Sequence, residues 1–261
     1  MTEAIVTYLG DVDPVMKQLI RAAGPLELEA REAHSPFETL ARAIAHQQLN
    51  GKAAQSILNR FISTCGGGIF PAPESLLALE DAALRASGFS FSKIAALRDL
   101  ATKTVSGVVP ERAVLHSLSD LEIIERLTAV RGIGRWTVEM LLMFQLRRPD
   151  VLPVDDFGVR HGFRLAYGHK EMPAPKALAL FGERWGPYRS AAAWYLWRAV
   201  DLSRAGKLPP PAQTVKLPRL PRKRRKLKRA AASAVRPARS DAQTRARRPP
   251  ARRSRAPGKK K

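Results

Sequence analysis

Two glycines flanked by arginines, Arg131-Gly132-Ile133-Gly134-Arg135, form one of two short motifs in this chain whose residue types could do chemistry. Glycine has no Cβ, so a Gly-x-Gly turn lets an anion approach the backbone N–H groups at the start of the next helix. Arg131 and Arg135 would add positive charge there, and the natural anion is a nucleic-acid phosphate. The spacing also fits an ordinary tight turn between helices. No strand pattern precedes it, which disfavours a dinucleotide site.

The second motif is a pair of carboxylates, Asp155 and Asp156, which follows a proline-containing loop and precedes Phe157 at a predicted helix start. Aspartates in this position commonly cap a helix by accepting hydrogen bonds from its free N–H groups. The alternative is that one of them caps the helix while the other faces a cavity. A carboxylate in a cavity can stabilise positive charge on a reacting group or assist the attack of water.

The aromatic residues are few but unevenly placed. They make up 7% of the chain, and all four tryptophans lie between residues 136 and 197. Large aromatic side chains most often fill cores. An indole face also attracts cations, so some of these tryptophans are candidates for the walls of a pocket.

The elements that must position these motifs have helical patterns almost throughout. Ser35, Pro36 and Glu38 have the spacing of an N-cap, a first helical residue and the acid of a capping box. Gly88 has the place of a C-terminal glycine after a helix over 80–87. Further helices are predicted from Lys93 onward, after Ser119 with its capping-box acid Glu122, over 137–146 and over 190–204.

Some of these predictions concern burial. We expect the helix over 137–146, which is apolar on nearly every side, to be the central buried helix. In the helix after Ser119, we expect Leu121, Ile124 and Leu127 to form the buried stripe. The first ten residues are expected to form a short strand or an extended arm. Together the patterns predict an all-α domain over residues 1–206.

Positive charge is concentrated at the C-terminal end. The formal charge of the chain is +22, and residues 207–261 hold 21 of the 45 lysines and arginines but one of the 23 acidic residues. Such a segment cannot bury enough apolar surface to offset its chain entropy, so we expect a disordered tail. The cationic run over 222–229 predicts a sequence-independent tether to DNA. A dispensable extension, or a nuclear localisation signal in a eukaryote, are the alternatives.

Several classes of protein are excluded by composition. A single cysteine, Cys65, rules out a disulfide within the chain and any cysteine-based zinc or iron–sulfur site, and the five histidines show no metal-ligand spacing. No apolar run approaches the ~18 residues of a membrane span. The N-terminus lacks the pattern of a secretory signal, so we expect a reducing, cytoplasmic location.

Taken together, residues 127–156 resemble the helix-hairpin-helix DNA glycosylase superfamily. The likeness is carried by residues 127–137, the apolar helix that follows, and residues 149–157. It is most similar to the 3-methyladenine DNA glycosylase II branch, which residues 36–48, 183–190 and 194–197 also support. The likeness covers about residues 13–204. It implies two helical subdomains with the active site in the cleft between them.

The resemblance also implies roles for individual residues. Asp156 would be the catalytic carboxylate, because breaking an N-glycosidic bond builds positive charge on the sugar, and Asp155 would be its structural neighbour. Trp136 and Trp197 would form the walls of the base pocket, with Phe157 beside the carboxylate. A base methylated at a ring nitrogen is cationic and would stack well on indole faces.

Two positions depart from related enzymes. Trp136 stands where bifunctional relatives have a Schiff-base lysine, so the resemblance implies a monofunctional enzyme that uses water and leaves an abasic site. Met140 stands where the best-known relatives have a tyrosine, so the base pocket is expected to be looser or differently selective. Trp185 and Tyr188 are expected to be structural.

The expected partner is double-stranded DNA, bound by a monomer with no membrane contact. Base flipping is a property of glycosylases in general. Gln48 and Leu49 are the candidates for the wedge that fills the gap left by the flipped base, although Leu49 also fits the core. The resemblance implies that Arg131, Gly132, Gly134 and Arg135 contact the DNA backbone. No metal cofactor is expected, except for a monovalent cation that hairpin carbonyls bind in this superfamily.

The sequence thus predicts a glycosylase that excises alkylated purines, chiefly 3-methyladenine and also 7-methylguanine, from duplex DNA at the start of base excision repair. It would act at the nucleoid in a bacterium, or in the nucleus of a eukaryote. One alternative is a glycosylase for oxidised or deaminated bases, which are neutral and need more hydrogen bonding than mostly apolar walls would offer. The other is a DNA-binding module without catalysis, which would need none of Asp156, Trp136 and Trp197.

Overall fold

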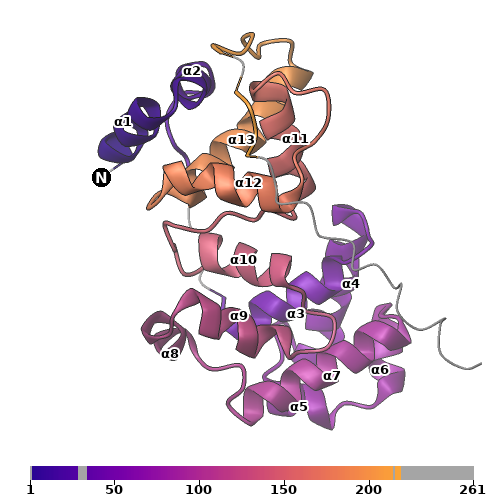
Figure 1. The fold of residues 1–261 in the computed structure, drawn as a ribbon. Coiled ribbons are helices and arrows are strands. Elements are labelled where there is room, and N and C mark those ends of the chain that lie inside the picture. The colour runs from indigo at the N-terminus through magenta and orange to yellow at the C-terminus, as the bar shows by residue number, and fades with distance from the viewer. Residues whose placement is uncertain (1, 29–33, 214, 219–261) are drawn as a thin grey trace, which may run out of the picture. The chain divides into compact units, whose positions relative to one another are not determined.

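The computed structural model describes residues 2–28, 34–213 and 215–218, and every regular element in these ranges is a helix (Figure 1). This confirms the predicted all-α class. The elements are α1 (Thr2–Val12), α2 (Pro14–Ala23), α3 (Pro36–His46), α4 (Gly51–Gly66), α5 (Pro73–Ala78), α6 (Asp81–Ser87), α7 (Phe91–Val105), α8 (Arg112–Ser117), α9 (Asp120–Thr128), α10 (Arg135–Phe144), α11 (Phe157–Ala166), α12 (Pro175–Gly182), the 3-10 helix η1 (Glu183–Trp185) and α13 (Arg189–Arg204).

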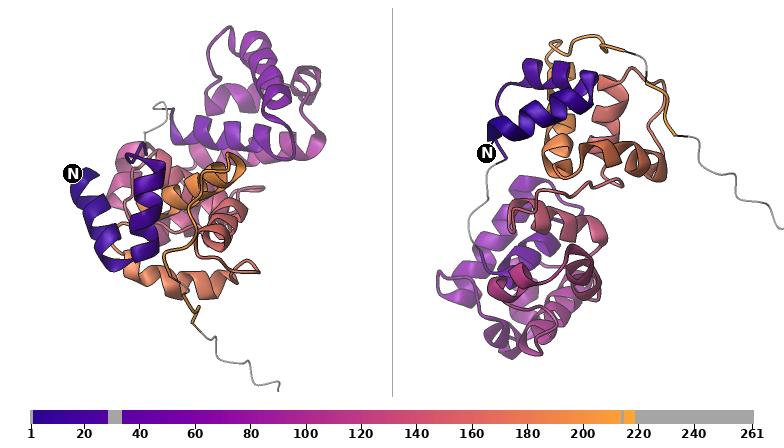
Figure 2. Two further views of the ribbon diagram at one scale, coloured as in Figure 1. Left: turned by 90° about the horizontal axis from the view of Figure 1, so that it is seen from above. Right: turned by 60° about the vertical axis from the view of Figure 1, so that its left-hand side comes forward.

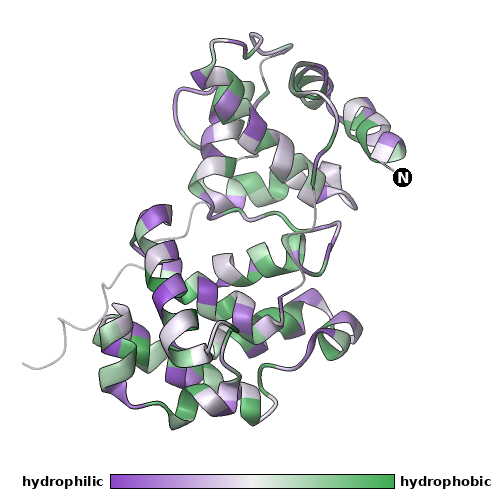
Figure 3. Cartoon of the chain, turned by 180° about the vertical axis from the view of Figure 1, so that it is seen from behind, coloured by the Kyte–Doolittle hydropathy of each residue, from purple (hydrophilic) through white to green (hydrophobic). Residues whose placement is uncertain are grey.

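These helices form two groups. The central part of the chain, α3 to α10, packs as one group, with α7 against α3 and α5 and with α9 against α10. The two ends of the body form the other group, in which α2 and α11 both pack on α13. Figures 1 and 2 show α10 at the side of the central group that faces α11 to α13. Apolar residues line the inward faces of the helices in both groups (Figure 3).

Helices α11 and α13 approach each other closely because α11 carries glycines one turn apart on the face that meets α13. A Cβ at Gly162 would collide with the backbone carbonyl of Leu196, and a Cβ at Gly158 would lie 2.7 Å from Cδ1 of Trp197. Small residues at i and i+4 share one helix face and allow such contact. The pair therefore fixes the position of Trp197 relative to the start of α11.

Most of the predicted helix boundaries are confirmed. Ser35 Oγ accepts from the Glu38 amide at the start of α3, and Gly88 ends α6 in the left-handed region. Ser119 and Glu122 form a complete capping box at the start of α9. Helix α7 begins slightly earlier than predicted, because Ser90 caps it.

Two local predictions are wrong. Residues 2–12 form helix α1 and no strand or extended arm, because Ile5, Leu9 and Val12 share one helix face and pack against the core. In α9 the buried face is centred on Ile123 and Leu127, while Leu121 is 62% exposed. Leu127 is buried and Ile124 packs against the core as predicted, so the prediction is wrong at Leu121 alone.

Asp13 ties the N-terminal helices to the rest of their group. Its buried carboxylate accepts from the amides of Val15 and Met16, from the Tyr167 hydroxyl (2.7 Å) and from Nε1 of Trp185 (3.1 Å). Burial and the neighbouring Asp13 raise the pKa of Tyr167 well above its ordinary value. Trp185 is fully buried, as expected for a structural tryptophan.

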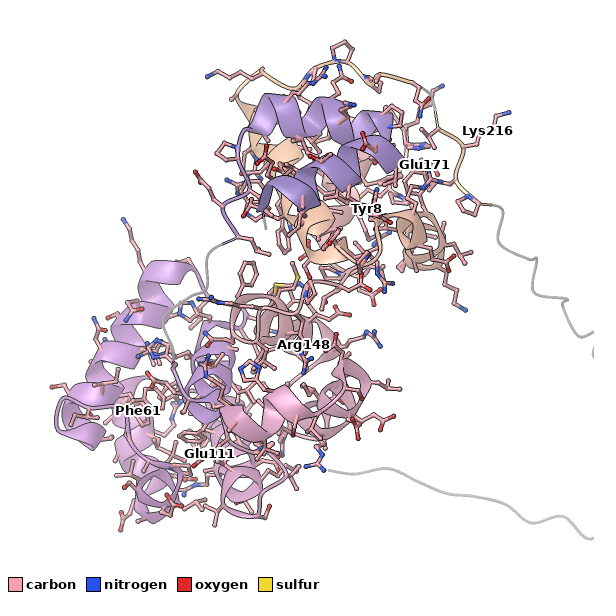
Figure 4. All side chains as sticks on the ribbon, turned by 90° about the vertical axis from the view of Figure 1, so that its left-hand side faces the viewer. Tyr8, Phe61, Glu111, Arg148, Glu171 and Lys216 are labelled. Atoms are coloured by element: carbon pink, nitrogen blue, oxygen red, sulfur yellow. The ribbon has the colours of Figure 1, made fainter. Side chains whose placement is uncertain are left out.

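A second link between these segments runs through Tyr8 of α1, which is labelled in Figure 4. Its hydroxyl donates to the carbonyl of Gly186, and its ring meets that of Tyr188 edge-on at 5.4 Å. Tyr188 is thus a packing residue, as predicted.

The chain after α13 lies partly against the body. Leu208, Val215 and Leu217 are partly buried and pack against the core, although the tail was predicted to begin at Lys207. The cationic run over 222–229 and the rest of the predicted disordered tail, 219–261, lie outside the described residues. Among the described helices, none combines the length and the apolar character needed to cross a bilayer.

Candidate active site

The carboxylate of Asp156 accepts three N–H hydrogen bonds. Nε1 of Trp136 donates to Oδ2 at 2.8 Å, Nε1 of Trp197 donates to Oδ1 at 2.9 Å, and the Val159 amide donates to Oδ1 at 2.7 Å. Trp136 belongs to α10 in the central group, whereas Asp156 and Trp197 belong to the other group. The predicted catalytic residue and both predicted tryptophan walls therefore meet at the boundary between the two groups.

The sequence predicts that one aspartate caps the helix and the other faces a cavity, but Asp156 alone combines the cap with the contacts to the indoles. It is the N-cap of α11, through the bond from the Val159 amide, and it also faces the two indoles. Asp155 is exposed and makes no cap bond to this helix. The cap fixes the carboxylate relative to α11, so one residue supplies both the helix start and the candidate reactive group.

Gly158 completes this arrangement. A Cβ at this position would lie 2.9 Å from Nε1 of Trp197 and 3.1 Å from Oδ1 of Asp156. Only glycine leaves room for the indole N–H to reach the carboxylate. The sequence signal for this residue was its place directly after the motif Asp155-Asp156-Phe157, but spacing alone could not show what it would touch.

A cavity of about 1090 Å³ runs along one face of α10. Trp136, Met140 and Phe144 recur at i, i+4 and i+8 and all line it. Trp136 is 50% exposed, which is high for such a large apolar side chain. Phe144 also stacks on Trp197, with centroids 6.0 Å apart and an interplanar angle of 23°. Phe144 was missed in the sequence, although its spacing from Trp136 and Met140 would have indicated it.

The opposite wall of the cavity is more polar than predicted. It comes from the residues just before α3, α3 itself, the following loop and α4. Its polar side chains are His34, Thr39, Arg42, His46, Gln47, Gln48 and Gln55. The cavity therefore has an aromatic and apolar side on α10 and a hydrogen-bonding side across from it. Asp156 and Trp197 do not line it, so Trp136 stands between this space and the carboxylate.

Phe157 lies beside the carboxylate in sequence but does not line the cavity. It is 65% exposed at the first position of α11 and stacks on His161, one turn later, at 5.5 Å. The described structure thus places Phe157 on the surface next to the site. Its predicted part in the pocket wall stays a prediction.

The hairpin between α9 and α10 has the exposed backbone that its glycines predicted. Arg131, Gly132, Gly134 and Arg135 are exposed, whereas Ile133 between the glycines is buried. Gly132 has a φ of 80°, in the region that favours glycine. Gly134 is the N-cap of α10 and offers no side chain to its first amides. Gly134, Arg135 and Trp136 are all exposed, so the start of α10 is open to an anion.

Side chains from α7 and from the loop after α3 anchor the hairpin backbone. Oδ2 of Asp99 accepts from the Arg131 amide at 2.7 Å, and the Lys103 ammonium donates to both oxygens of Asp99. Burial opposes ionisation of Asp99, but the Arg131 amide and Lys103 outweigh it and lower its pKa. From the loop after α3, Nε2 of Gln47 donates to the Gly132 carbonyl at 2.7 Å.

The predicted wedge residues lie in that same loop. Gln48 is exposed and has a φ of 57°, which is unusual for a residue with a side chain. Leu49 is 40% exposed, so the alternative that it belongs to the core is wrong. Lys93 donates to the Ala45 carbonyl at 2.7 Å and so holds the end of α3. Hydrogen bonds from Gln47 and Lys93 therefore fix the start of the loop, while Gln48 and Leu49 at its tip are exposed.

Two carbonyls of the hairpin, the group predicted to bind a monovalent cation, already accept hydrogen bonds within the protein. Those of Val130 and Gly132 accept from the Ile133 amide and from Gln47. Each carbonyl has a second lone pair, and the monovalent cation stays a prediction. Within the described ranges, no three His, Cys, Asp or Glu side chains are grouped so as to hold a metal ion.

Comparison with known proteins points to one group of DNA repair proteins. The sequence profile described as HhH-GPD superfamily base excision DNA repair protein matches residues 41–187. The chain is 42% identical over 197 residues to DNA-3-methyladenine glycosylase 1 of Schizosaccharomyces pombe, across 75% of this chain and 86% of that protein.

Solved structures agree with this. The S. pombe 3-methyladenine DNA glycosylase in complex with abasic DNA has a TM-score of 0.68 at 41% identity, and the match covers 77% of this chain and 98% of that one. The DNA-3-methyladenine glycosidase of Bacillus halodurans has a TM-score of 0.70 at 36% identity, with 77% and 91% covered.

Proposed function

The chain belongs to the HhH-GPD superfamily of base excision DNA repair proteins, and we propose that it is a monofunctional DNA glycosylase for alkylated purines. It releases 3-methyladenine, and also 7-methylguanine, from double-stranded DNA and leaves an abasic site. The observation that carries this proposal is the carboxylate of Asp156 between the N–H groups of two indoles. A module that only binds DNA has no use for this arrangement.

Asp156 acts on the sugar. Cleavage of the N-glycosidic bond leaves positive charge on the deoxyribose ring as the base departs. A carboxylate fixed by three N–H donors is already oriented when that charge develops, so little reorganisation is needed in the transition state. It also helps to orient the water that attacks the sugar carbon.

The aromatic face of α10 receives the base. A purine methylated at a ring nitrogen carries positive charge, and an exposed indole such as that of Trp136 attracts it through its π face. The same positive charge makes the base a good leaving group, so the enzyme does not need a strong general acid. Met140 and Phe144 extend this wall along the cavity.

Water is the nucleophile in this proposal. A strand-cutting glycosylase needs an amine close to the sugar to form an imine. The position directly after the hairpin arginine Arg135 holds Trp136, and among the described residues no lysine lines the cavity along α10. The expected product is therefore an intact strand with an abasic site.

Double-stranded DNA is the partner, and the protein binds it as a monomer. The exposed start of α10, with Arg131 and Arg135, binds one stretch of phosphates. The exposed tip Gln48-Leu49 fills the gap left by the flipped base. The protein acts where the DNA is, at the nucleoid of a bacterium or in a eukaryotic nucleus.

The direct test is to incubate the protein with methylated duplex DNA and to identify the released bases by mass. We expect free 3-methyladenine and an uncut strand until the abasic sites are cleaved by alkali. Release of only oxidised or deaminated bases from suitably damaged DNA would favour the alternative that the polar wall of the cavity permits. Release of no base at all would refute a glycosylase.

A further inference from the structure

Glu139 of α10 is a buried acid that the proposed chemistry does not use. It is 3% exposed. Burial raises its pKa above the ordinary value, and the nearby charges of Asp155 and Asp156 add to this, whereas Arg135 acts against it. A buried carboxylate with a single ion-pair partner adds little stability and often reduces it. Its presence one turn after the hairpin therefore suggests a functional role.

The partner of Glu139 is one of the two hairpin arginines. Nε of Arg135 donates to Oε1 of Glu139 at 2.8 Å, while the Arg135 side chain itself is exposed. Within the described residues no other hydrogen bond of this guanidinium is found. Its terminal nitrogens therefore remain available, and an arginine fork binds phosphate oxygens in bidentate fashion.

Arg189, which lines the same cavity as Arg135, differs from it in how its guanidinium is bonded. Glu139 and Arg135 line a cavity of about 370 Å³ together with Asp150 and Arg189. Arg189 donates through Nε and Nη2 to the two oxygens of Asp150, both at 2.6 Å. Both of these donors of Arg189 are used within the protein, whereas Arg135 is bound at Nε alone.

We propose that Glu139 is a positioning residue for DNA binding: it holds Arg135 by Nε so that the two terminal nitrogens of the guanidinium are presented to a phosphate beside the hairpin. An arginine that is held in place loses less conformational entropy when it binds. This inference rests on the proposed function only in taking DNA as the ligand.

The sign of the effect separates this role from a simple charge effect. Removing a negative charge near a DNA-binding surface strengthens binding, because the net attraction to phosphates increases. If Glu139 positions Arg135, its removal weakens binding although the protein becomes more positive. Glu125 of α9 is an exposed acid that does not contact Arg135, and Glu125→Gln measures the charge effect alone.

The experiment measures the affinity of the full chain for a short undamaged duplex at several salt concentrations. We expect Glu139→Leu to weaken binding about twofold or more. Glu139→Gln should bind at least as well as the wild type, because its amide oxygen still accepts from Nε. In an Arg135→Ala background, Glu139→Leu should no longer weaken binding, and Arg135→Ala alone should lower the salt slope by about 0.9.

The kinetic expectation is that Glu139→Leu raises KM for damaged DNA and leaves kcat unchanged. Binding by Glu139→Leu as tight as that of the wild type, or an equal loss in the Arg135→Ala background, would overturn the proposal. Should Glu139→Leu not fold, as judged by circular dichroism, an unchanged salt slope in Arg135→Ala overturns it. These affinities do not depend on chemistry, so failure of the proposed function would appear separately, as absence of base release.

Discussion

At the scale of single residues, the site depends on how closely side chains approach one another, which sequence spacing does not encode. Asp156, Trp136 and Trp197 were predicted and are brought together. The sequence did not reveal that Asp156 is itself the helix cap, because either of two adjacent aspartates fits that role. Gly158 was missed because its role arises from contact with Trp197, far along the chain. Glu139 and Phe144 were also missed, although each lies at helical spacing from a residue that was predicted, Arg135 and Trp136.

Gly158→Ala tests the contact between Trp197 and Asp156. The added methyl group would lie 2.7 Å from Trp197 Cδ1, so the indole must move away from the carboxylate. We expect base release under saturating single-turnover conditions to fall about tenfold or more, by analogy with the loss of one oriented donor, while duplex binding persists. The matched control is Gly51→Ala at the start of α4, where nothing lies near a Cβ; an equal loss in both variants would contradict the argument.

Glu139 gives a prediction about pH and stability. Its folded-state pKa lies above the ordinary value of 4.5 because of burial, so the native state binds this proton more tightly than the unfolded state. Its contribution to stability therefore falls as pH rises from 4.5 through the folded pKa. We expect Glu139→Gln to become more stable relative to the wild type between about pH 4 and pH 7. Urea unfolding at several pH values measures this, and a difference that shrinks with rising pH would count against it.

At the scale of elements, caps and glycines indicated where helices begin and end more reliably than apolar patterns indicated which face is buried. Ser35, Gly88 and Ser119 mark the predicted ends. Leu121 of α9 was predicted on the buried face but is exposed, and α1 was not recognised as a helix. Both errors have one cause: in short helices the packing against neighbours selects the buried face.

Asp13→Ala tests the element contacts that hold α1 and α2. The substitution leaves two backbone amides, the Tyr167 hydroxyl and the Trp185 N–H without their acceptor in a buried place. We expect a loss of about 3 kcal/mol or more in the free energy of unfolding. Ser119→Ala, which removes an exposed cap, should cost about 1 kcal/mol. If urea unfolding gave the same loss of unfolding free energy for both variants, the buried bonds of Asp13 would contribute no more than an exposed cap.

At the scale of the whole molecule, the sequence separated a nearly neutral body from a cationic end, and the all-α architecture followed from periodicity and from the resemblance. The composition did not predict the C-terminal boundary of the packed body. Leu208, Val215 and Leu217 pack on the core although the sequence around them is rich in proline and charge. A composition shift marks where polar residues begin to dominate, not where the last apolar contact lies.

Deleting residues 219–261 tests the tether while keeping those contacts. The segment holds 19 lysines and arginines and one acid. We expect weaker binding to undamaged duplex and a smaller salt slope, because fewer counterions are released. Single-turnover base release at saturating protein should stay nearly unchanged. A salt slope equal to that of the full chain would rule out the tether.

Asp156 is the residue on which the proposed activity depends most. The most direct test is the single-turnover rate of base release by Asp156→Asn on methylated duplex DNA, with duplex affinity measured on the same sample. Asparagine caps a helix about as well as aspartate, so fold and binding should be retained. We expect the rate to fall by about 100-fold or more, since the charge opposite the sugar is lost. A rate equal to that of the wild type, with binding intact, would contradict the assignment of this carboxylate.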